Sequence, residues 1–212
     1  MDNQIWFGNR NSLTAYGLEL IRCTLTPAVR KQRWVDVPGG DGSVELMAPA
    51  GLIAYENRTL RAELRCVTGR LGNVLDRLTH DLEGNTVKII LPGSPMRYVE
   101  GVCHVNSAHR GGKSVTVSAV CGPWRYSCHL STARQPASPE GITFRWANGG
   151  SKPVIPELTV GEGGTDLTWN DEIIHLDEGR HLDPRLVIPA HSFITGYTMG
   201  GTVTAQWREA IL

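Results

Sequence analysis

The chain has 212 residues, which is enough for one large domain or two small domains with a buried core. Its 21 Lys and Arg residues balance 21 Asp and Glu residues, so it lacks the basic excess typical of proteins whose main ligand is nucleic acid. Its apolar runs fall short of the roughly 20 residues that cross a membrane, and the N-terminus lacks the pattern of a secretory signal. We therefore expect neither a signal peptide nor membrane insertion.

The first distinctive stretch is "DVPGGDGSVEL" (36–46). Pro38 restricts φ to about −65°, while Gly39, Gly40 and Gly42 allow values of φ that other residues avoid. A phosphate-binding loop is one interpretation, but such a loop lies between a strand and a helix and usually carries a Lys, Ser or Thr at fixed spacing. Here a strand pattern follows and no lysine is present, which favours a structural turn in a hairpin or long surface loop.

Strand patterns dominate the next part of the chain. Apolar and charged residues alternate from residue 60 to 66, as expected for a half-buried strand. Three more segments rich in β-branched and aromatic residues predict strands, at 86–91, 97–105 and 113–121.

One segment between these strands has helical periodicity. Its apolar residues fall three and four positions apart: Leu71, Val74, Leu75, Leu78 and Leu82. Gly84 is a suitable C-terminal stop. The pattern predicts a single amphipathic helix at about 70–84, packed on a sheet.

From residue 128 to 141 the pattern lapses into small and polar residues with two prolines, which is typical of a linker. Seven short strand patterns follow without a helix: "ITFRWAN", "IPELTV", "TDLTWN", "EIIHL", "RLVIP", "SFITGYT" and "GTVTAQWREAIL". This succession predicts a small β-sandwich or jelly roll. We therefore expect two mainly β domains, 1–130 and 131–212.

Five cysteines occur without a CxxC pair: Cys23, Cys66, Cys103, Cys121 and Cys128. Three of them fall in apolar strand patterns, where a thiol acts as a small core residue. The odd count favours reduced thiols in a chain made and assembled in a cytoplasm.

A metal site is the first chemical hypothesis to test. The seven histidines are His80, His104, His109, His129, His175, His181 and His191, and they form no HxH, HExxH or Cys/His cluster. The nearest approach to a ligand set is His175, Asp177, Glu178, His181 and Asp183. A charged turn between two strands is the favoured interpretation, so we expect no metal and no cofactor.

Catalytic motifs are equally sparse. Cys103-His104 and Cys128-His129 are the adjacent Cys and His pairs, and neighbours in a strand point to opposite faces. Glycoside hydrolysis needs two carboxylates that converge across a cleft, and the sequence alone does not show whether the available ones do. These are Glu157, Glu162, Asp166 and Asp171. We expect no enzymatic activity.

Sugar binding by aromatic stacking is a separate possibility for the C-terminal strands, which contain Trp146, Trp169 and Trp207. Tryptophan in a strand is more often a core or half-core residue. Both interpretations stay open at this point.

Motifs before residue 130 resemble, in order, the N-terminal domain of the distal tail proteins (Dit) of long-tailed bacteriophages. The matching segments are "YGL" (16–18), "VDVPGGDGSVEL" (35–46), "YENRTLRAEL" (55–64), the helix ending in "LEGN", "KIILPGSPMRYVEGVCHV" (88–105) and "VTVSAVCGPWRYS" (115–127). Gly40 replaces the arginine usual in the VPGRDG-type turn, and "GPWRY" (122–126) stands where a proline-tyrosine-lysine-tyrosine run is common.

The C-terminal half is similar to the galectin-like β-sandwich of the same family. "NGGSKPVIPELTV" (148–160) resembles its first strands, and the end of the chain resembles its closing strands. His191 and Ser192 depart from the family's P-G-x-N-x-I turn.

The resemblance implies a structural virion protein that forms a homohexameric ring, with the 38–42 turn at the ring-forming face. The ring would lie at the virion tail tip, where it joins the tail tube protein to the hub or baseplate and to a receptor-binding protein. DNA would pass through its lumen only as cargo. An alternative function is a carbohydrate-binding module that recognises host glycans through the C-terminal sandwich.

Overall fold

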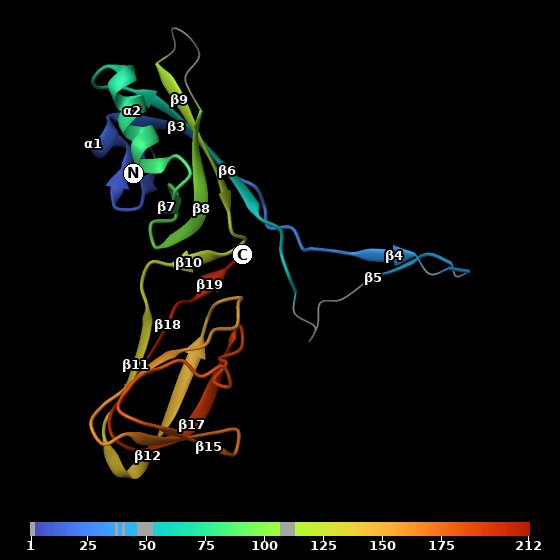
Figure 1. Cartoon of the computed structure of the whole chain (residues 1–212), viewed down its shortest axis with the longest axis vertical. Coiled ribbons are helices and arrows are strands. Elements are labelled where there is room, and N and C mark those ends of the chain that lie inside the picture. The colour runs from blue at the N-terminus through green and yellow to red at the C-terminus, as the bar shows by residue number, and fades with distance from the viewer. Residues whose placement is uncertain (1–2, 37, 40, 46–52, 107–112) are drawn as a thin grey trace. The chain divides into compact units, whose positions relative to one another are not determined.

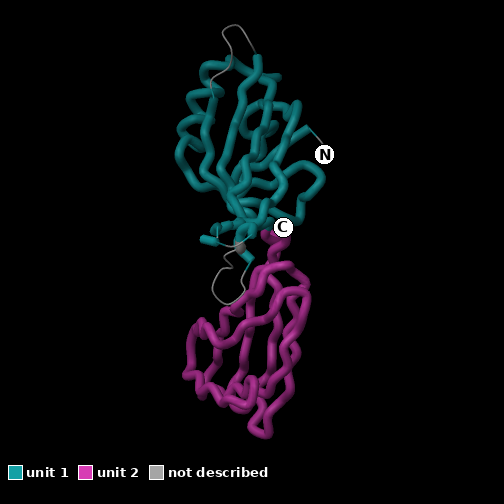
Figure 2. The backbone as a smooth tube through the Cα atoms, turned by 90° about the vertical axis from the view of Figure 1, so that its right-hand side faces the viewer, with its two compact units in different colours: residues 1–125 teal, residues 126–212 magenta. Residues whose placement is uncertain are grey.

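The computed structural model describes residues 3–36, 38–39, 41–45, 53–106 and 113–212. The protein is mainly β, which confirms the fold class predicted from the sequence. It divides into two compact units, Met1–Arg125 (unit 1) and Tyr126–Leu212 (unit 2) (Figure 2). Each unit has its own hydrophobic core. The division falls a few residues before the boundary expected near residue 130.

Unit 1 is built on one antiparallel sheet with the strand order β2-β1-β7-β8-β9-β6-β3 (Figure 1). The strands are β1 (Trp6–Phe7), β2 (Arg10–Asn11), β3 (Leu18–Leu25), β6 (Arg58–Cys66), β7 (Thr86–Ile90), β8 (Arg97–Asn106) and β9 (Ser114–Cys121). The four strands predicted between residues 60 and 121 are confirmed as β6, β7, β8 and β9.

Alternation along β6 explains how this sheet builds its core. Leu60, Ala62 and Leu64 are fully buried, while the charged residues between them are not. They lie opposite Ala119, Val117 and Val115 of β9, which are also buried. Because directly opposed side chains lie on the same face of a sheet, both strands present one continuous apolar surface.

The predicted helix is confirmed as α2 (Leu71–Leu82). Its buried residues, Leu78 and Leu82, belong to the core of unit 1, and Val74 and Leu75 contact that core from partly buried positions. Gly84, just beyond the helix, has a φ of +70°, as expected for a glycine that ends a helix.

The expectation of one helix is corrected by a second, α1 (Ser12–Tyr16). This helix is only five residues long, so it shows no periodic pattern of apolar residues. The residues that cap its two ends determine where it begins and ends. The Asn11 side chain accepts hydrogen bonds from the amides of Leu13 and Thr14, and Gly17 closes the helix with a φ of +66°. The Tyr16 hydroxyl donates to Asp81 Oδ2 at 2.9 Å, which links α1 to α2.

Unit 2 contains two four-stranded sheets, with the orders β11-β18-β13-β16 and β12-β17-β14-β15. Their strands are β11 (Ser131–Gln135), β12 (Ser138–Asn148), β13 (Glu157–Val160), β14 (Thr165–Trp169), β15 (Glu172–Leu176), β16 (Gly179–His181), β17 (Ser192–Gly200) and β18 (Val203–Trp207). Two short strands, β10 (Arg125–Ser127) and β19 (Ala210–Ile211), pair with each other. Apolar residues from both four-stranded sheets share one core, which makes the unit a β-sandwich.

Two expectations for this part of the chain were wrong. The segment 128–141 is not a linker, because β11 and the start of β12 lie within it. β11 is an edge strand that pairs with β18, and its backbone bonds hold it although its side chains are mostly polar. "RLVIP" (185–189) is not a strand but a loop with one bridge, Val154 to Ile188; its Leu186 and Ile188 are fully buried.

Candidate interaction surfaces

The glycine-rich turn joins two short strands, β4 (Trp34–Asp36) and β5 (Ser43–Glu45). Gly39 and Gly42 have φ values of +77° and +79°, in the region that favours glycine. Pro38 lies in the same turn, and Gly40 lies outside the described residues. Because strand β5 follows where a phosphate-binding loop would need a helix, the geometry is that of a hairpin turn.

This hairpin is the end of a longer ribbon, which we call the arm (the described residues between Val29 and Glu56). At its root the amide of Lys31 donates to the Ala54 carbonyl, and the amide of Glu56 donates to the Val29 carbonyl, both at 2.8 Å. β4 and β5 form a two-stranded sheet that is separate from the main sheet (Figure 1). The arm is therefore held by its own ladder of backbone bonds.

Apolar side chains of the arm are exposed. Trp34 is 56% exposed and Val35 is 43% exposed. Since they are adjacent in a strand, they lie on opposite faces of the ribbon. Val29 and Ile53 are also exposed. Trp34 and Val35 thus leave exposed apolar surface on both faces of the ribbon at β4, and a lone two-stranded hairpin is at best marginally stable in water.

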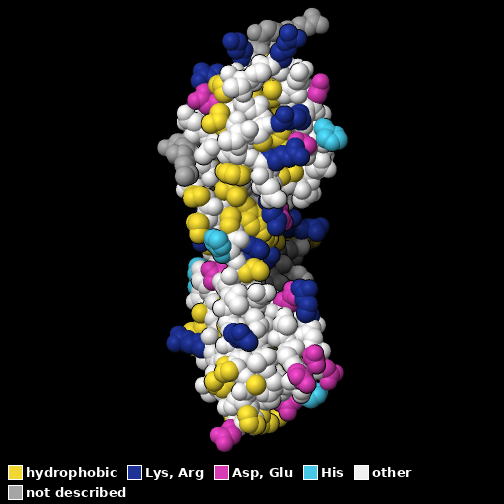
Figure 3. All heavy atoms as spheres, turned by 90° about the vertical axis from the view of Figure 1, so that its left-hand side faces the viewer, with side chains coloured by type: hydrophobic (Ala, Val, Ile, Leu, Met, Phe, Trp, Pro, Cys, Tyr) yellow, Lys and Arg dark blue, Asp and Glu magenta, His cyan; other side chains and the backbone are white. Residues whose placement is uncertain are grey.

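A second apolar surface of unit 1 is a groove beside β1 and the loop after β7. Its volume is about 550 Å³, and its lining includes Gln4, Trp6, Ile90, Leu91, Pro92 and Pro95. The Trp6 side chain is 40% exposed. In Figure 3, hydrophobic side chains gather on the lower part of unit 1, while Lys and Arg side chains are scattered.

The three tryptophans considered for sugar stacking lie in different surroundings. Trp146 is fully buried and stacks on Phe144 within the sandwich core, and Trp207 is 6% exposed. Neither ring presents a face to solvent on which a sugar stacks. Trp169 is partly buried against the same core.

Within the polar set around residues 175–183, His175 lies between two carboxylates, and its Nε2 is 3.6 Å from Asp177 Oδ1. His175 Nδ1 lies 2.6 Å from Asp166 Oδ1, while His181 Nε2 lies 2.7 Å from the Asp177 carbonyl. The hydrogen bond to Asp166 raises the pKa of His175. Among the residues that the structure describes, no group of three or more His, Cys, Asp or Glu side chains is arranged to hold a metal ion.

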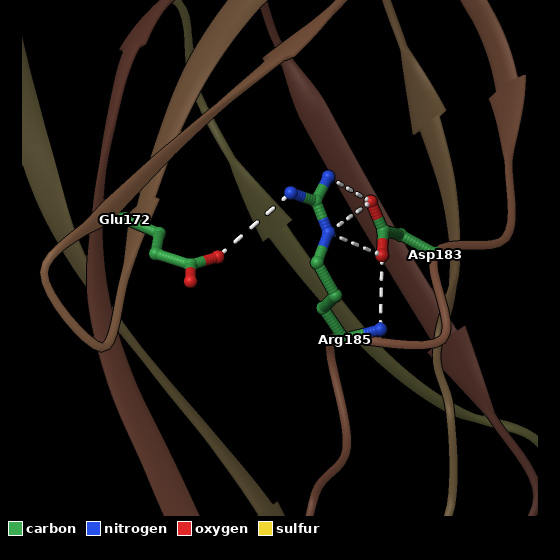
Figure 4. Close-up of polar contacts among 3 residues, drawn as sticks. All are labelled: Glu172, Asp183 and Arg185. Atoms are coloured by element: carbon green, nitrogen blue, oxygen red, sulfur yellow. Dashed lines mark hydrogen bonds and ion pairs between the residues drawn. The ribbon is translucent and has the colours of Figure 1, made fainter.

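Asp183, the last residue of that set, is engaged by Arg185 (Figure 4). Arg185 Nη2 donates to Asp183 Oδ2 at 2.6 Å, and the Arg185 amide donates to Asp183 Oδ1 at 2.9 Å. These hydrogen bonds lower the pKa of Asp183. Glu172 lies on the other side of the guanidinium, with 3.8 Å between Glu172 Oε2 and Arg185 Nη1. The cluster thus joins the loop after β16 to the start of β15.

The candidate catalytic carboxylates do not form a pair of free acids. Glu157 lies in β13 and forms an ion pair with Arg180, whereas Asp166 lies in β14 and is bonded to His175. β13 and β14 belong to different sheets of the sandwich. Glu162 lies in a turn between them, and Asp171 in the β14–β15 turn.

Burial makes the core thiols poor nucleophiles. Desolvation raises the pKa of Cys103 to about 12 and the pKa values of Cys23 and Cys121 to about 11. Cys103 is fully buried while His104 is exposed and bonded to Glu83, so the two residues point to opposite faces as predicted. Cys128 is partly buried.

Trp34 and Trp6 were not among the predicted site residues, although both belong to apolar surfaces of unit 1. A signal for Trp34 was present, because "RKQRWVD" (30–36) places a large aromatic residue in a charged segment just before a turn.

No helix among the described residues is long and apolar enough to span a membrane.

Comparison with known proteins finds similarity to a solved structure. No family model and no curated protein matches the sequence. The structure is similar to the crystal structure of Dit (gp 19.1) of phage SPP1, described as a paradigm of the hub adsorption apparatus in phages that infect Gram-positive bacteria. The TM-score is 0.68 at 13% sequence identity, and the match covers 98% of this chain and 99% of that one. The chain therefore has, over nearly its whole length, the two-unit β fold of this phage distal tail protein.

Proposed function

We propose that the protein is a distal tail protein, a non-catalytic structural component of the tail tip of a long-tailed bacteriophage or related tail-like particle. The observation that carries the proposal is the similarity of fold to SPP1 Dit over 98% of this chain and 99% of that one. A match of this extent includes both units, in the same order along the chain. A similarity limited to the sandwich would cover only unit 2.

In the proposed role, six copies form a ring that joins the tail tube protein to the hub or baseplate, with DNA as cargo in the lumen and a receptor-binding protein nearby. Unit 1 would carry most of the ring contacts, including the 38–42 turn. The uncovered apolar side chains of the arm support a role in assembly, because large exposed apolar surfaces mark interaction sites. The individual pairing of Glu157 and Asp166 supports a role without catalysis.

Glycan recognition by unit 2 is the weaker candidate. Of the three tryptophans that suggested it, Trp146 and Trp207 are core residues, so only Trp169 would remain for stacking. We do not favour this function for that reason.

The test is the position of the protein in purified tails. Labelling with an antibody to the chain, followed by symmetric averaging of tail images, is expected to place a six-fold ring at the distal end of the tube. Particles lacking the chain should have no organised tip. Label along the tube or on the head, or intact adsorbing tails without the chain, would contradict the proposal.

A further inference from the structure

A second pocket of unit 1 lies between α1 and α2, the two helices that the Tyr16–Asp81 hydrogen bond links (Figure 1). Its volume is about 390 Å³. Its lining comes from α1, from the turn after β6 and from the N-terminal half of α2. No Asp or Glu side chain is among the described residues that line it, whereas Arg70 and Arg77 are. The pocket therefore carries a positive excess that the chain as a whole, with a net charge of zero, does not have.

The Arg77 guanidinium is held in place at the wall of this pocket. Its Nη2 donates a hydrogen bond to the Ala15 carbonyl, and its Cζ lies 5.6 Å from the centroid of the Tyr16 ring. A guanidinium has five N–H donors in a rigid fork. Because the contact with Ala15 uses one of them, the others are positioned in advance for a ligand.

Arg70 and Asn73 bring further donors to the same pocket. Neither side chain forms a hydrogen bond or an ion pair with any residue that the structure describes. Arg70, Asn73 and Arg77 follow one another at intervals of three and four residues, so they lie on one face of the helix. Seven helical residues rise by about 10 Å, and the two long arginine side chains can therefore reach one ligand above Asn73.

A phosphate group fits this set of donors. The planar fork of an arginine matches phosphate in a bidentate manner, and phosphate has enough terminal oxygens to meet two guanidiniums and an amide at once. A carboxylate, with two oxygens, would leave more of the donors unused. One water molecule occupies about 30 Å³ of liquid, so the pocket has room for more than the phosphate itself. Leu13 and Val74 supply an apolar part of the lining for the rest of such a ligand.

We propose that the pocket between α1 and α2 binds a phosphate group, with Arg70 and Arg77 on its oxygens and Asn73 between them. The ligand is free phosphate or a phosphate monoester whose body lies against Leu13 and Val74. The site shares no lining residue with the groove beside β1. It does not depend on the function proposed above.

Isothermal titration calorimetry of the full-length chain at low ionic strength tests the site with two probes, inorganic phosphate and phenyl phosphate. Saturable binding of one phosphate per chain is expected. Tighter binding of phenyl phosphate would identify a monoester as the ligand, because its ring gains the apolar wall. Equal affinities would identify free phosphate. NMR spectra of the same samples should show shifted amides within 13–17 and 68–77, the segments that line the pocket.

Two variants remove the proposed contacts. Arg70→Gln deletes one charge without breaking a contact to the described residues, and Asn73→Asp places a carboxylate beside the phosphate. Each is expected to weaken binding by about tenfold or more, the effect of losing a hydrogen bond to a charged group. Arg22→Gln is the matched control, since Arg22 is an exposed residue of β3 outside the pocket, and its affinity should equal that of the parent. The melting temperature of each variant verifies that it is folded.

Four results would overturn the site. The first is no saturable binding of either probe up to about 10 mM, an affinity too weak for a built site. The second is an equal loss of affinity in Arg70→Gln and Arg22→Gln, which would show attraction by the overall charge of unit 1. The third is a set of shifted amides outside the lining segments. The fourth is acetate that binds as tightly as phosphate, which would contradict the assigned ligand.

Discussion

The rings of Phe144 and Trp146 stack inside the sandwich core of unit 2, with centroids 4.1 Å apart and an interplanar angle of 24°. The two residues are two positions apart in β12 and therefore lie on the same face of the strand. That face is directed into the core, where Phe144 is 3% exposed and Trp146 is fully buried.

Trp146→Ala should therefore destabilise unit 2 strongly. Removing a buried tryptophan leaves a cavity that its neighbours fill only in part, which typically costs about 3–5 kcal/mol. Denaturant unfolding monitored by circular dichroism measures the change in the free energy of unfolding. Ile173→Ala, at a 71% exposed position in the same unit, is expected to change stability by less than about 0.5 kcal/mol. A Trp146→Ala protein as stable as the parent would contradict the burial described above.

Gly101→Ala should destabilise unit 1, because the strand opposite leaves no room for a side chain. A Cβ atom at Gly101 would lie 2.6 Å from Cys121 Sγ and 2.8 Å from the Val120 carbonyl oxygen. Forced shifts of this kind in a packed region typically cost about 1–3 kcal/mol. Gly122→Ala is the control, since a Cβ there would meet nothing within 4 Å. Equal melting temperatures for the two variants would show that β8 and β9 make room for the added methyl group without loss of stability.

Gly42→Val should loosen the arm and impair assembly with little effect on global melting. Gly42 has a φ of +79°, and a β-branched residue there strains the backbone by about 1–3 kcal/mol. The strain falls on a ribbon that forms its own two-stranded sheet, so it promotes local opening and not unfolding of the core. Hydrogen exchange at the amides of β4 and β5 measures the opening, and particle mass measures assembly. Asp41→Val, in the same turn but without positive φ, should have the smaller effect.

The His175–Asp166 pair should show a pH dependence of defined sign. The hydrogen bond to Asp166 raises the pKa of His175 above its unfolded value of about 6.5. The stabilising effect of the pair is therefore fully present below pH 6.5 or so, and it is lost as the pH rises through the raised folded pKa. NMR titration of the ring protons reads this pKa directly. Asp166→Asn should return the pKa toward 6.5 or so, and an unchanged titration curve would contradict the pairing.

Local patterns were sufficient to predict the elements in which apolar residues recur at the regular spacing of a strand or a helix. β6 was predictable because Leu60, Ala62 and Leu64 alternate with charged residues, and α2 because its leucines follow helical spacing. α1 was not predicted, because a helix of five residues between caps at Asn11 and Gly17 is too short to show helical periodicity. β11 was not predicted, because pairing with β18 makes it a strand and its own mostly polar residues show no alternation of apolar and polar side chains.

The sequence by itself determined the mainly β class, two domains and a glycine-rich turn, since these follow from periodicity, composition and the φ preferences of Gly and Pro. Only the tertiary structure decided which tryptophans are buried and which are exposed. Trp146 and Trp34 are both strand tryptophans, yet one is enclosed between two sheets and the other stands on an arm without cover in the described residues. Burial depends on what lies opposite a side chain across the sheets, and segments distant in the sequence supply those contacts.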